Sequence, residues 1–238
     1  MSQLALDRAS ARHPALDPAV RRIGQLQPHL PVQTSLLIAV AAAVVTLAAT
    51  RPLVRHLSTA AHEGAHAMMG SGFGHRVASV RLARDGTGVT SIAAAAGSRG
   101  PGVLTAVVGY LGPSLFGLAA AELIRIGHIV AVLWLGLLAL LVILPLLRGA
   151  FGCLSVLVTG GLLFLVAWQA SLGVQVGLAY GIAWFLLLAG VREVLEHGSG
   201  AADAALLRRL TLVPRGFWSA LWLASTAAAL IIGARLLL

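Results

Sequence analysis

Long stretches without a charged residue alternate with short polar segments along most of this chain. The uncharged stretches are residues 32–50, 101–121, 126–147, 149–191 and 216–234. An α-helix needs about 20 apolar residues to cross a bilayer, so each stretch is long enough for at least one span. The stretch 149–191 is long enough for two spans, and its natural break is at residues 169–173.

Residues 53–100 depart from this pattern. Residues 53–70 are less apolar than the spans but still predict a helix, and a run of glycines closes it. Residues 77–82 and 88–92 alternate loosely between apolar and polar positions, and the Asp85-Gly86 pair between them is a turn signal. These residues predict a β-hairpin at the membrane surface or within the protein. The hairpin either offers an edge strand to an extended substrate or simply connects two helices, and the sequence leaves both roles open.

The first 31 residues form a separate polar segment with four arginines and four prolines. We expect residues 1–31 to be a cytoplasmic tail that is flexible or weakly helical, and residues 32–238 to be one membrane-embedded domain. Counting the helix at residues 53–70 gives seven spans, with the N-terminus in the cytoplasm and the C-terminus outside. This arrangement places 13 of the 17 arginines on the cytoplasmic side, in agreement with the positive-inside rule.

The composition supports the same fold class. Hydrophobic residues make up 58% of the chain and charged residues 11%, which is typical of a polytopic membrane protein. The net charge of +9 does not indicate nucleic-acid binding, because the arginines are scattered between the apolar segments. All 17 basic residues are arginine, which suggests a GC-rich bacterial genome and hence a bacterial plasma membrane. We therefore predict an all-α polytopic membrane protein with about six to seven transmembrane helices and a small β-hairpin.

The helix predicted at residues 53–70 contains His62-Glu63-Gly64-Ala65-His66, which has the form H-E-x-x-H. Residues four apart share one helix face, so His62 and His66 can bind a single metal ion. Neutral imidazoles suit Zn²⁺, which lowers the pKa of its bound water to about 7, and Glu63 can accept a proton from that water. With eight histidines and four glutamates in 238 residues, only about 0.004 accidental matches are expected. The alternative is a pair of ordinary histidines in a packed helix.

A catalytic zinc site needs a third protein ligand and an open position for water. In the predicted topology the polar segment 192–215 faces the same side as His66. This segment offers four candidates: Glu193, Glu196, His197 and Asp203. Glu193 and Glu196 flank Arg192 and are typical of solvated interface charges, whereas Asp203 lies among small apolar residues. From its position alone, Asp203 could equally stabilise the first turn of a helix that begins after Ser199.

The H-E-x-x-H motif, the hairpin and the segment Gly109-Tyr110-Leu111-Gly112-Pro113 together resemble the site-2-protease class of intramembrane zinc metalloproteases, most of all its compact bacterial branch. That branch carries Ser-Asp-Ala near its C-terminus, followed by a Leu-rich stretch, a Thr, a Pro and a Trp. The matching residues here are Ala202, Asp203, Ala204, Leu206, Leu207, Leu210, Thr211, Pro214 and Trp218. Ala202 replaces the branch's Ser, and the Asn-Pro-x-x-Asp-Gly pattern of better-known members is absent. The resemblance covers roughly residues 55–237 and implies that Asp203 is the third ligand.

The resemblance implies a zinc endopeptidase that cuts single-span membrane proteins within or near the lipid bilayer. His62, His66 and Asp203 would hold Zn²⁺, and Glu63 would be the general base. A second interpretation is a membrane zinc protease of the prenyl-protein-processing type, in which Glu193 or Glu196 would be the third ligand. A third is a non-catalytic scaffold or transport protein that keeps a metal site.

Overall fold

The structure, a computed structural model, describes residues 17–48, 52–85, 87–93, 99–198 and 200–238 and is dominated by helices. Its elements in chain order are α2 (Asp17–Gly24), α3 (Val32–Ala48), α4 (Pro52–Gly72), β1 (Arg76–Leu82), β2 (Gly88–Ala93), α5 (Arg99–Arg125), α6 (Ile129–Ile143), the 3₁₀ turn η1 (Leu144–Leu146), α7 (Ala150–Gln169), α8 (Leu172–His197), α9 (Ala202–Thr211) and α10 (Arg215–Leu237). Within these residues, five helices are long and apolar enough to cross a membrane, namely α5, α6 with η1, α7, α8 and α10. The predicted all-α polytopic membrane fold with a small β-hairpin is confirmed.

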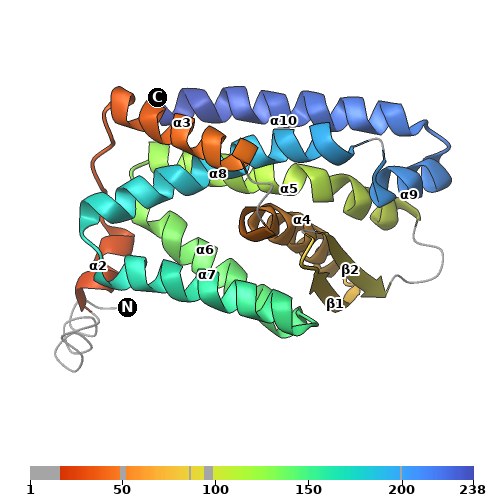
Figure 1. Cartoon of the computed structure of the whole chain (residues 1–238), viewed down its shortest axis with the longest axis horizontal. Helices are drawn as coiled ribbons and strands as arrows, with labels where there is room; N and C mark the ends of the chain where they lie inside the picture. Colours follow the sequence, from red (N-terminus) through yellow and green to blue (C-terminus); the bar gives the residue numbers. More distant parts are fainter. Residues whose placement is uncertain (1–16, 49–51, 86, 94–98, 199) are drawn as a thin grey trace.

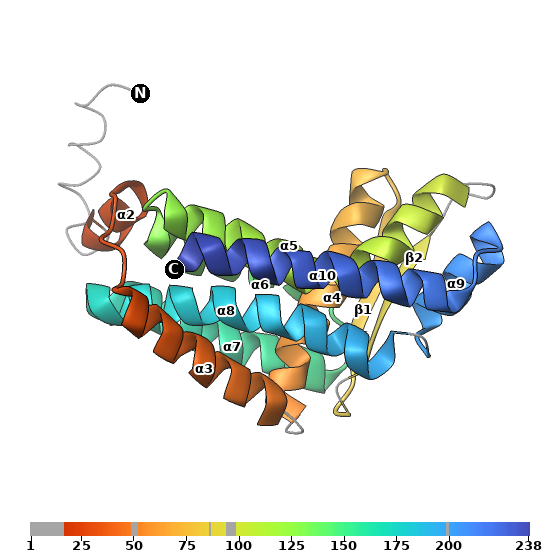
Figure 2. The same ribbon diagram turned by 90° about the horizontal axis from the view of Figure 1, so that it is seen from above.

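Six helices form the body of the molecule and reverse direction from each one to the next (Figure 1). They are the five candidate spans and α3, which is apolar but shorter. The break predicted at residues 169–173 lies where α7 ends and α8 begins. In the middle of the bundle, Leu133, Tyr180 and Leu187 are almost fully buried. In Figures 1 and 2, α2 and the end of α10 lie at one end of the bundle, and α9 and the hairpin lie at the other.

Helix α4 runs across this bundle rather than along it. Figure 1 shows α4 nearly end-on, whereas Figure 2, turned by 90°, shows it crossing the neighbouring helices. Its histidines and Glu63 are buried against other elements of the protein. If these polar groups faced lipid instead, they would have no hydrogen-bonding partners. Helix α4, which the sequence analysis counted as a seventh span, lies across the six helices. It is therefore not part of the series of helices that alternate in direction. In the described part of the chain, α2 and the end of α10 lie at the same end of the bundle (Figures 1 and 2), so the placement of the two chain ends on opposite sides of the membrane stays a prediction.

Glycines in α5 allow this crossing to be close. A Cβ atom at Gly112 would lie 2.5 Å from the Cβ atom of Ala65 and 3.0 Å from the carbonyl oxygen of Ala61, both in α4. Only a residue without a side chain fits such a separation. Helix α5 continues through Pro113. At Gly112-Pro113 the sequence therefore allows close packing of α5 against α4.

The predicted β-hairpin is present, and it lies against α4. Strands β1 and β2 pair in antiparallel fashion, with an irregularity between Val77 and Ser79. At the turn, one carboxylate oxygen of Asp85 accepts hydrogen bonds from the backbone N–H and the hydroxyl of Thr87, at 2.9 and 2.7 Å. The predicted turn residue Gly86 lies outside the described residues. The Ile92 side chain contacts α4 at Gly70, so the hairpin covers the same helix that carries the histidines.

Candidate metal centre

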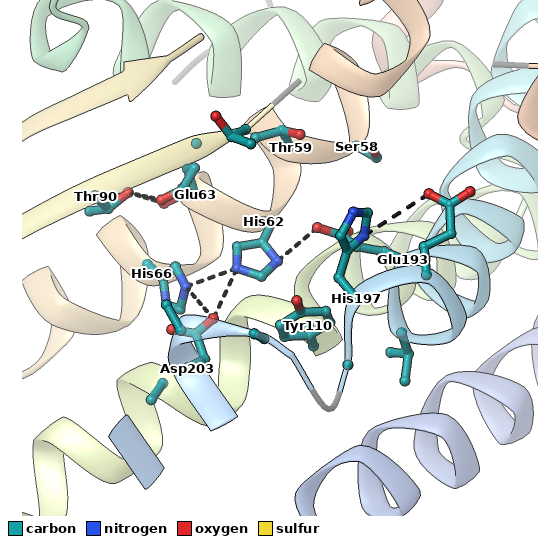
Figure 3. Close-up of a pocket in the computed structure, with 18 of the residues that line it drawn as sticks. Ser58, Thr59, His62, Glu63, His66, Thr90, Tyr110, Glu193, His197 and Asp203 are labelled. Carbon is teal, nitrogen blue, oxygen red and sulfur yellow. Dashed lines mark hydrogen bonds and ion pairs between the residues drawn. The ribbon is translucent and has the colours of Figure 1, made fainter. Parts of the chain in front are cut away.

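Three side chains from two distant parts of the chain converge at one point: His62 and His66 on α4, and Asp203 in the first turn of α9 (Figure 3). The Nε2 atom of His62 lies 3.0 Å from Nε2 of His66 and 3.2 Å from Oδ2 of Asp203. Nε2 of His66 lies 3.4 Å from the same oxygen. Ligand atoms of a tetrahedral zinc ion lie about 3.3 Å apart, given bonds of about 2.0–2.1 Å. The three atoms are therefore spaced as three ligands of one zinc ion would be.

The hydrogen bonding of His66 explains why a cation fits between these atoms. Nδ1 of His66 lies 2.8 Å from the carbonyl oxygen of Thr105, which can only accept, so Nδ1 carries the proton. Nε2 of the neutral ring is then an acceptor, and it faces a carboxylate oxygen and a second imidazole nitrogen. Three acceptors at this spacing repel each other unless a proton or a metal ion lies between them. The donor set of two imidazoles and one carboxylate suits Zn²⁺.

Asp203 is suited to binding a cation. Burial disfavours its ionised form, but the polar contacts with the rings of His62 and His66 outweigh that effect, and the pKa of its carboxyl lies below its ordinary value. The side chain is about one-fifth exposed, so the carboxylate lies at the edge of the site rather than beneath it. Asp203 also occupies the helix-stabilising position that the sequence allowed, but its side chain points toward the two histidines (Figure 3).

Glu193 lies behind His62, on the far side of the ring from Asp203. Its Oε1 atom is 3.0 Å from Nδ1 of His62, an ion-pair distance without the alignment of a hydrogen bond. A carboxylate behind a metal-binding histidine commonly fixes the orientation of the ring. The expectation that Glu193 is a solvated interface charge is wrong, because its side chain is only 17% exposed. Its place one turn before His197 on α8 was visible in the sequence, but its contact with α4 was not.

The other two candidates in this segment, Glu196 and His197, lie away from the candidate metal site formed by His62, His66 and Asp203. Glu196 forms a salt bridge with Arg192 at 2.7 Å and is 39% exposed, as expected for an interface charge. Nε2 of His197 lies 3.3 Å from the guanidinium group of Arg55, and its side chain is about half exposed. Among the described residues, only His62, His66 and Asp203 form a group that could hold a metal ion.

Glu63 is buried and faces the hairpin rather than a basic residue. Its Oε2 atom accepts a hydrogen bond of 2.6 Å from the hydroxyl of Thr90 on β2. Its carboxylate also interacts electrostatically with His62, His66 and Asp203, so it belongs to the same centre. Thr90 could not be identified from the sequence, because only the docking of the hairpin on α4 brings it to the motif.

The candidate metal site opens into a cavity of about 1040 Å³ lined by residues of α4, β2, α5, α8, α9 and α10. Val89, Ile92, Leu206 and Leu223 supply apolar surface to its wall, while Glu63, His62 and Asp203 supply the polar groups. A cavity of this size holds more than one amino-acid residue, and binding sites typically combine an apolar wall with a few polar groups. The arrangement therefore suits an apolar chain presented to a hydrolytic centre.

The Gly109–Pro113 segment of α5 packs against the rings of His62 and His66. A Cβ atom at Gly109 would lie 2.4 Å from Nε2 of His66 and 2.7 Å from Nε2 of His62, so glycine is needed at this position. The ring of Tyr110 meets the His62 ring edge-on with 4.8 Å between centroids, and stacks on Trp222 at 4.5 Å. Trp222 is fully buried and donates a hydrogen bond to the carbonyl of Val107. The segment therefore provides both the space and the packing that place His62.

A comparison with protein families agrees with this geometry. The Peptidase M50B-like family matches residues 35–233, from α3 almost to the end of α10, and the match includes all four predicted site residues. Searches among curated proteins and among solved structures gave no match. The family match spans well over half of the chain and confirms the resemblance drawn from the motifs. The chain therefore belongs to the Peptidase M50B-like family of site-2-protease-type membrane metalloproteases.

Proposed function

We propose that this protein is an intramembrane zinc endopeptidase of a bacterial plasma membrane that hydrolyses peptide bonds of single-span membrane proteins. The observation that carries the proposal is the convergence of His62, His66 and Asp203 at 3.0–3.4 Å beside the buried Glu63 carboxylate. A packed helix with ordinary histidines has no reason to gather three acceptor atoms at the spacing of zinc ligands. The family match supports peptidase chemistry at this centre.

In this proposal His62, His66 and Asp203 would hold Zn²⁺, and each of the chain's own groups has a separate task. When bound, zinc lowers the pKa of a ligated water to about 7 and polarises the carbonyl of the scissile bond. Glu63 would take a proton from that water at Oε1, the oxygen that Thr90 does not bind, and deliver it to the leaving amine nitrogen. Glu193 would keep Nε2 of His62 directed at the metal.

The hairpin would present the substrate. Strand β1 is flanked by β2 on one side and by Leu147 and Arg148 on the other, whereas β2 pairs with no other strand in the described part of the chain. Residues of β2 also line the cavity. A transmembrane substrate must unwind before cleavage, because the carbonyl groups of a helix are internally hydrogen-bonded. An unwound segment could pair with the free edge of β2 and lie along the cavity.

The arrangement of the acidic residues favours this proposal over the prenyl-protein-processing interpretation. That interpretation needs Glu193 or Glu196 as the third ligand. Glu193 contacts Nδ1 of His62, which points away from Asp203, and Glu196 is paired with Arg192. Asp203 is the carboxylate that shares the Nε2 side of both histidines.

Cleavage and metal content, measured on the same purified protein, test the proposal. We expect about one zinc per chain, and fragments of a single-span substrate at a bond that mass spectrometry can place. Candidate substrates should have Gly, Ser or Asn in their helices, since such helices unwind most readily. Glu63→Gln keeps the size of the side chain but cannot accept the proton. It should therefore retain zinc while cleavage falls by at least about 10²-fold.

Glu122→Gln is the matched control, because Glu122 is exposed, paired with Arg125 and at the far end of α5. It should leave cleavage and zinc content unchanged. Near-normal cleavage by Glu63→Gln would exclude Glu63 as the base. Full zinc content without cleavage of any membrane substrate would instead favour a non-catalytic metal-binding scaffold.

A further inference from the structure

One face of β2 follows the stripe of α4 that carries Glu63. Alternate residues of a strand point to the same side, so Gly88, Thr90 and Ile92 share a face. Ile92 contacts α4 at Gly70, and Thr90 contacts it at Glu63. A Cβ atom at Gly88 would lie 2.6 Å from Oε1 of Glu63 and 2.5 Å from the methyl group of Thr59. The whole face of the strand therefore packs against this helix, with its middle directly over the proposed base.

The hydroxyl of Thr90 touches Glu63 twice. It lies 2.6 Å from the carboxylate oxygen Oε2 and 3.2 Å from the backbone carbonyl oxygen of the same residue. A hydroxyl has one hydrogen, and the shorter contact to a charged acceptor is the stronger one, so the proton points to Oε2. Gly88 meanwhile leaves the room that Oε1 occupies. One residue of β2 thus binds one carboxylate oxygen, and another makes space for the second.

We propose that Thr90 is a positioning residue for the proposed reaction: its hydroxyl holds Oε2 of Glu63, so that the orientation of the general base depends on the docking of the hairpin on α4. This inference rests on the proposed function, in which Glu63 is the base. It assigns the hairpin a task beyond contacting substrate. In this role the side chain of Thr90 acts on the reaction through Glu63.

The chain offers closely matched variants to test this role. Thr90→Val has almost the same shape but no hydroxyl, whereas Thr90→Ser keeps the hydroxyl. We expect Thr90→Val to lower kcat about 10- to 100-fold, the range for losing a hydrogen bond to a charged group, with KM changed less than about twofold. Thr90→Ser should restore most of kcat. Zinc content should stay at the wild-type level in both variants.

Ser91→Ala is the control on the same strand. Ser91 is exposed, pairs across the hairpin with Ser79 and lies on the opposite face from Thr90. Removing the hydroxyl group of Ser91 should change neither kcat nor KM. A second variant guards against misfolding of Thr90→Val: Gly88→Ala would place a methyl group 2.6 Å from Oε1 and should also lower kcat without loss of zinc.

Infrared difference spectroscopy gives a readout that does not depend on activity. Subtracting the spectrum of Glu63→Gln from that of the wild type isolates the carboxylate bands of Glu63. These bands should shift in Thr90→Val and return to their wild-type position in Thr90→Ser. If Glu63→Gln abolishes cleavage while Thr90→Val changes neither kcat nor the bands, the positioning role is refuted and the proposed function stands. If Glu63→Gln cleaves normally, the proposed function fails, and unshifted bands would then refute the Thr90 contact separately.

Discussion

Glu193 and His62 stand 3.0 Å apart, with the carboxylate on the Nδ1 side of the ring, so Nε2 is the nitrogen left to face Asp203 and His66. Nδ1 of His66 in turn donates a hydrogen bond to the carbonyl oxygen of Thr105. Each histidine therefore has one nitrogen occupied by the protein and one directed at the shared centre. This division between the two nitrogens is typical of metal-binding histidines.

Glu193→Ala should weaken zinc binding without abolishing it. Removing a carboxylate that orients a metal-binding histidine typically costs about 10- to 100-fold in metal affinity. Asp203→Ala removes a proposed ligand and should cost more than that. Competition with a zinc chelator of known affinity measures both changes. Glu196→Ala is the control, since Glu196 is paired with Arg192 outside the centre, and its affinity should equal the wild type. Equal losses in the Glu193 and Glu196 variants would contradict the role given to Glu193.

Gly109→Ala should remove zinc from an otherwise folded protein. The added methyl group would lie 2.4 Å from Nε2 of His66 and 2.7 Å from Nε2 of His62, so both ligand atoms would have to move. Gly102→Ala, in the same helix, would meet only the end of the flexible Leu210 side chain at 3.5 Å and should be tolerated. Elemental analysis of the two purified variants separates the outcomes. A Gly109→Ala protein with full zinc content would show that the histidines do not bind metal where α5 approaches α4.

Reporter fusions before α2 and after α10 should report the same side of the membrane. This expectation follows from the six helices that alternate in direction, with α4 lying across them (Figures 1 and 2). The arginines of the described residues are divided unequally between the two ends of the bundle. The end of the bundle with the candidate metal site carries ten arginines. The other end carries four: Arg21, Arg22, Arg125 and Arg235. The positive-inside rule then predicts that the candidate metal site lies near the cytoplasm, with α2 and the end of α10 on the outer side.

The sequence-based expectation of a cytoplasmic tail at residues 1–31 predicts the opposite orientation, and the reporters decide between the two. Reporters on opposite sides would show that α4 crosses the bilayer and would restore the seven-span arrangement. Both reporters in the cytoplasm would keep the six aligned helices but contradict the arginine argument. A third reporter in the turn between β1 and β2 decides between these cases, since the hairpin lies at the same end of the bundle as the candidate metal site.

The features that could be predicted from the sequence are those set by local spacing. Hydropathy over about 20 residues places the spans, and alternation around Asp85 places the hairpin, because each depends only on neighbouring residues. The histidine pair is local as well, since residues four apart share a helix face. Composition does not give the direction of a helix, however. The lower apolarity of residues 53–70 was visible, but the crosswise course of α4 depends on its packing against α5 and the hairpin.

The rest of the candidate site depends on contacts between distant segments. Asp203 is 141 residues from His62, and only the resemblance to a family selected it over Glu193 and Glu196. Glu193 looked like an interface charge because Arg192 precedes it, yet the side chain reaches α4. Thr90 carries no signal at all in the sequence. Its role follows from the register of β2, which brings one hydroxyl to within 2.6 Å of Glu63.

Removal of the metal should lower the thermal stability of the wild-type protein. Without a cation, the Nε2 atoms of His62 and His66 and Oδ2 of Asp203 would face each other as acceptors at 3.0–3.4 Å. A ligand present at 100 times its dissociation constant stabilises the folded state by about 2.7 kcal/mol, which corresponds to about 5–10 °C in Tm for a chain of this size. Chelation should therefore lower Tm by about that amount, and added zinc should restore it. The His62→Ala/His66→Ala double variant should show no change in Tm on chelation. An unchanged Tm in wild-type protein whose zinc has been shown to be removed would mean that the three side chains are arranged by the protein alone.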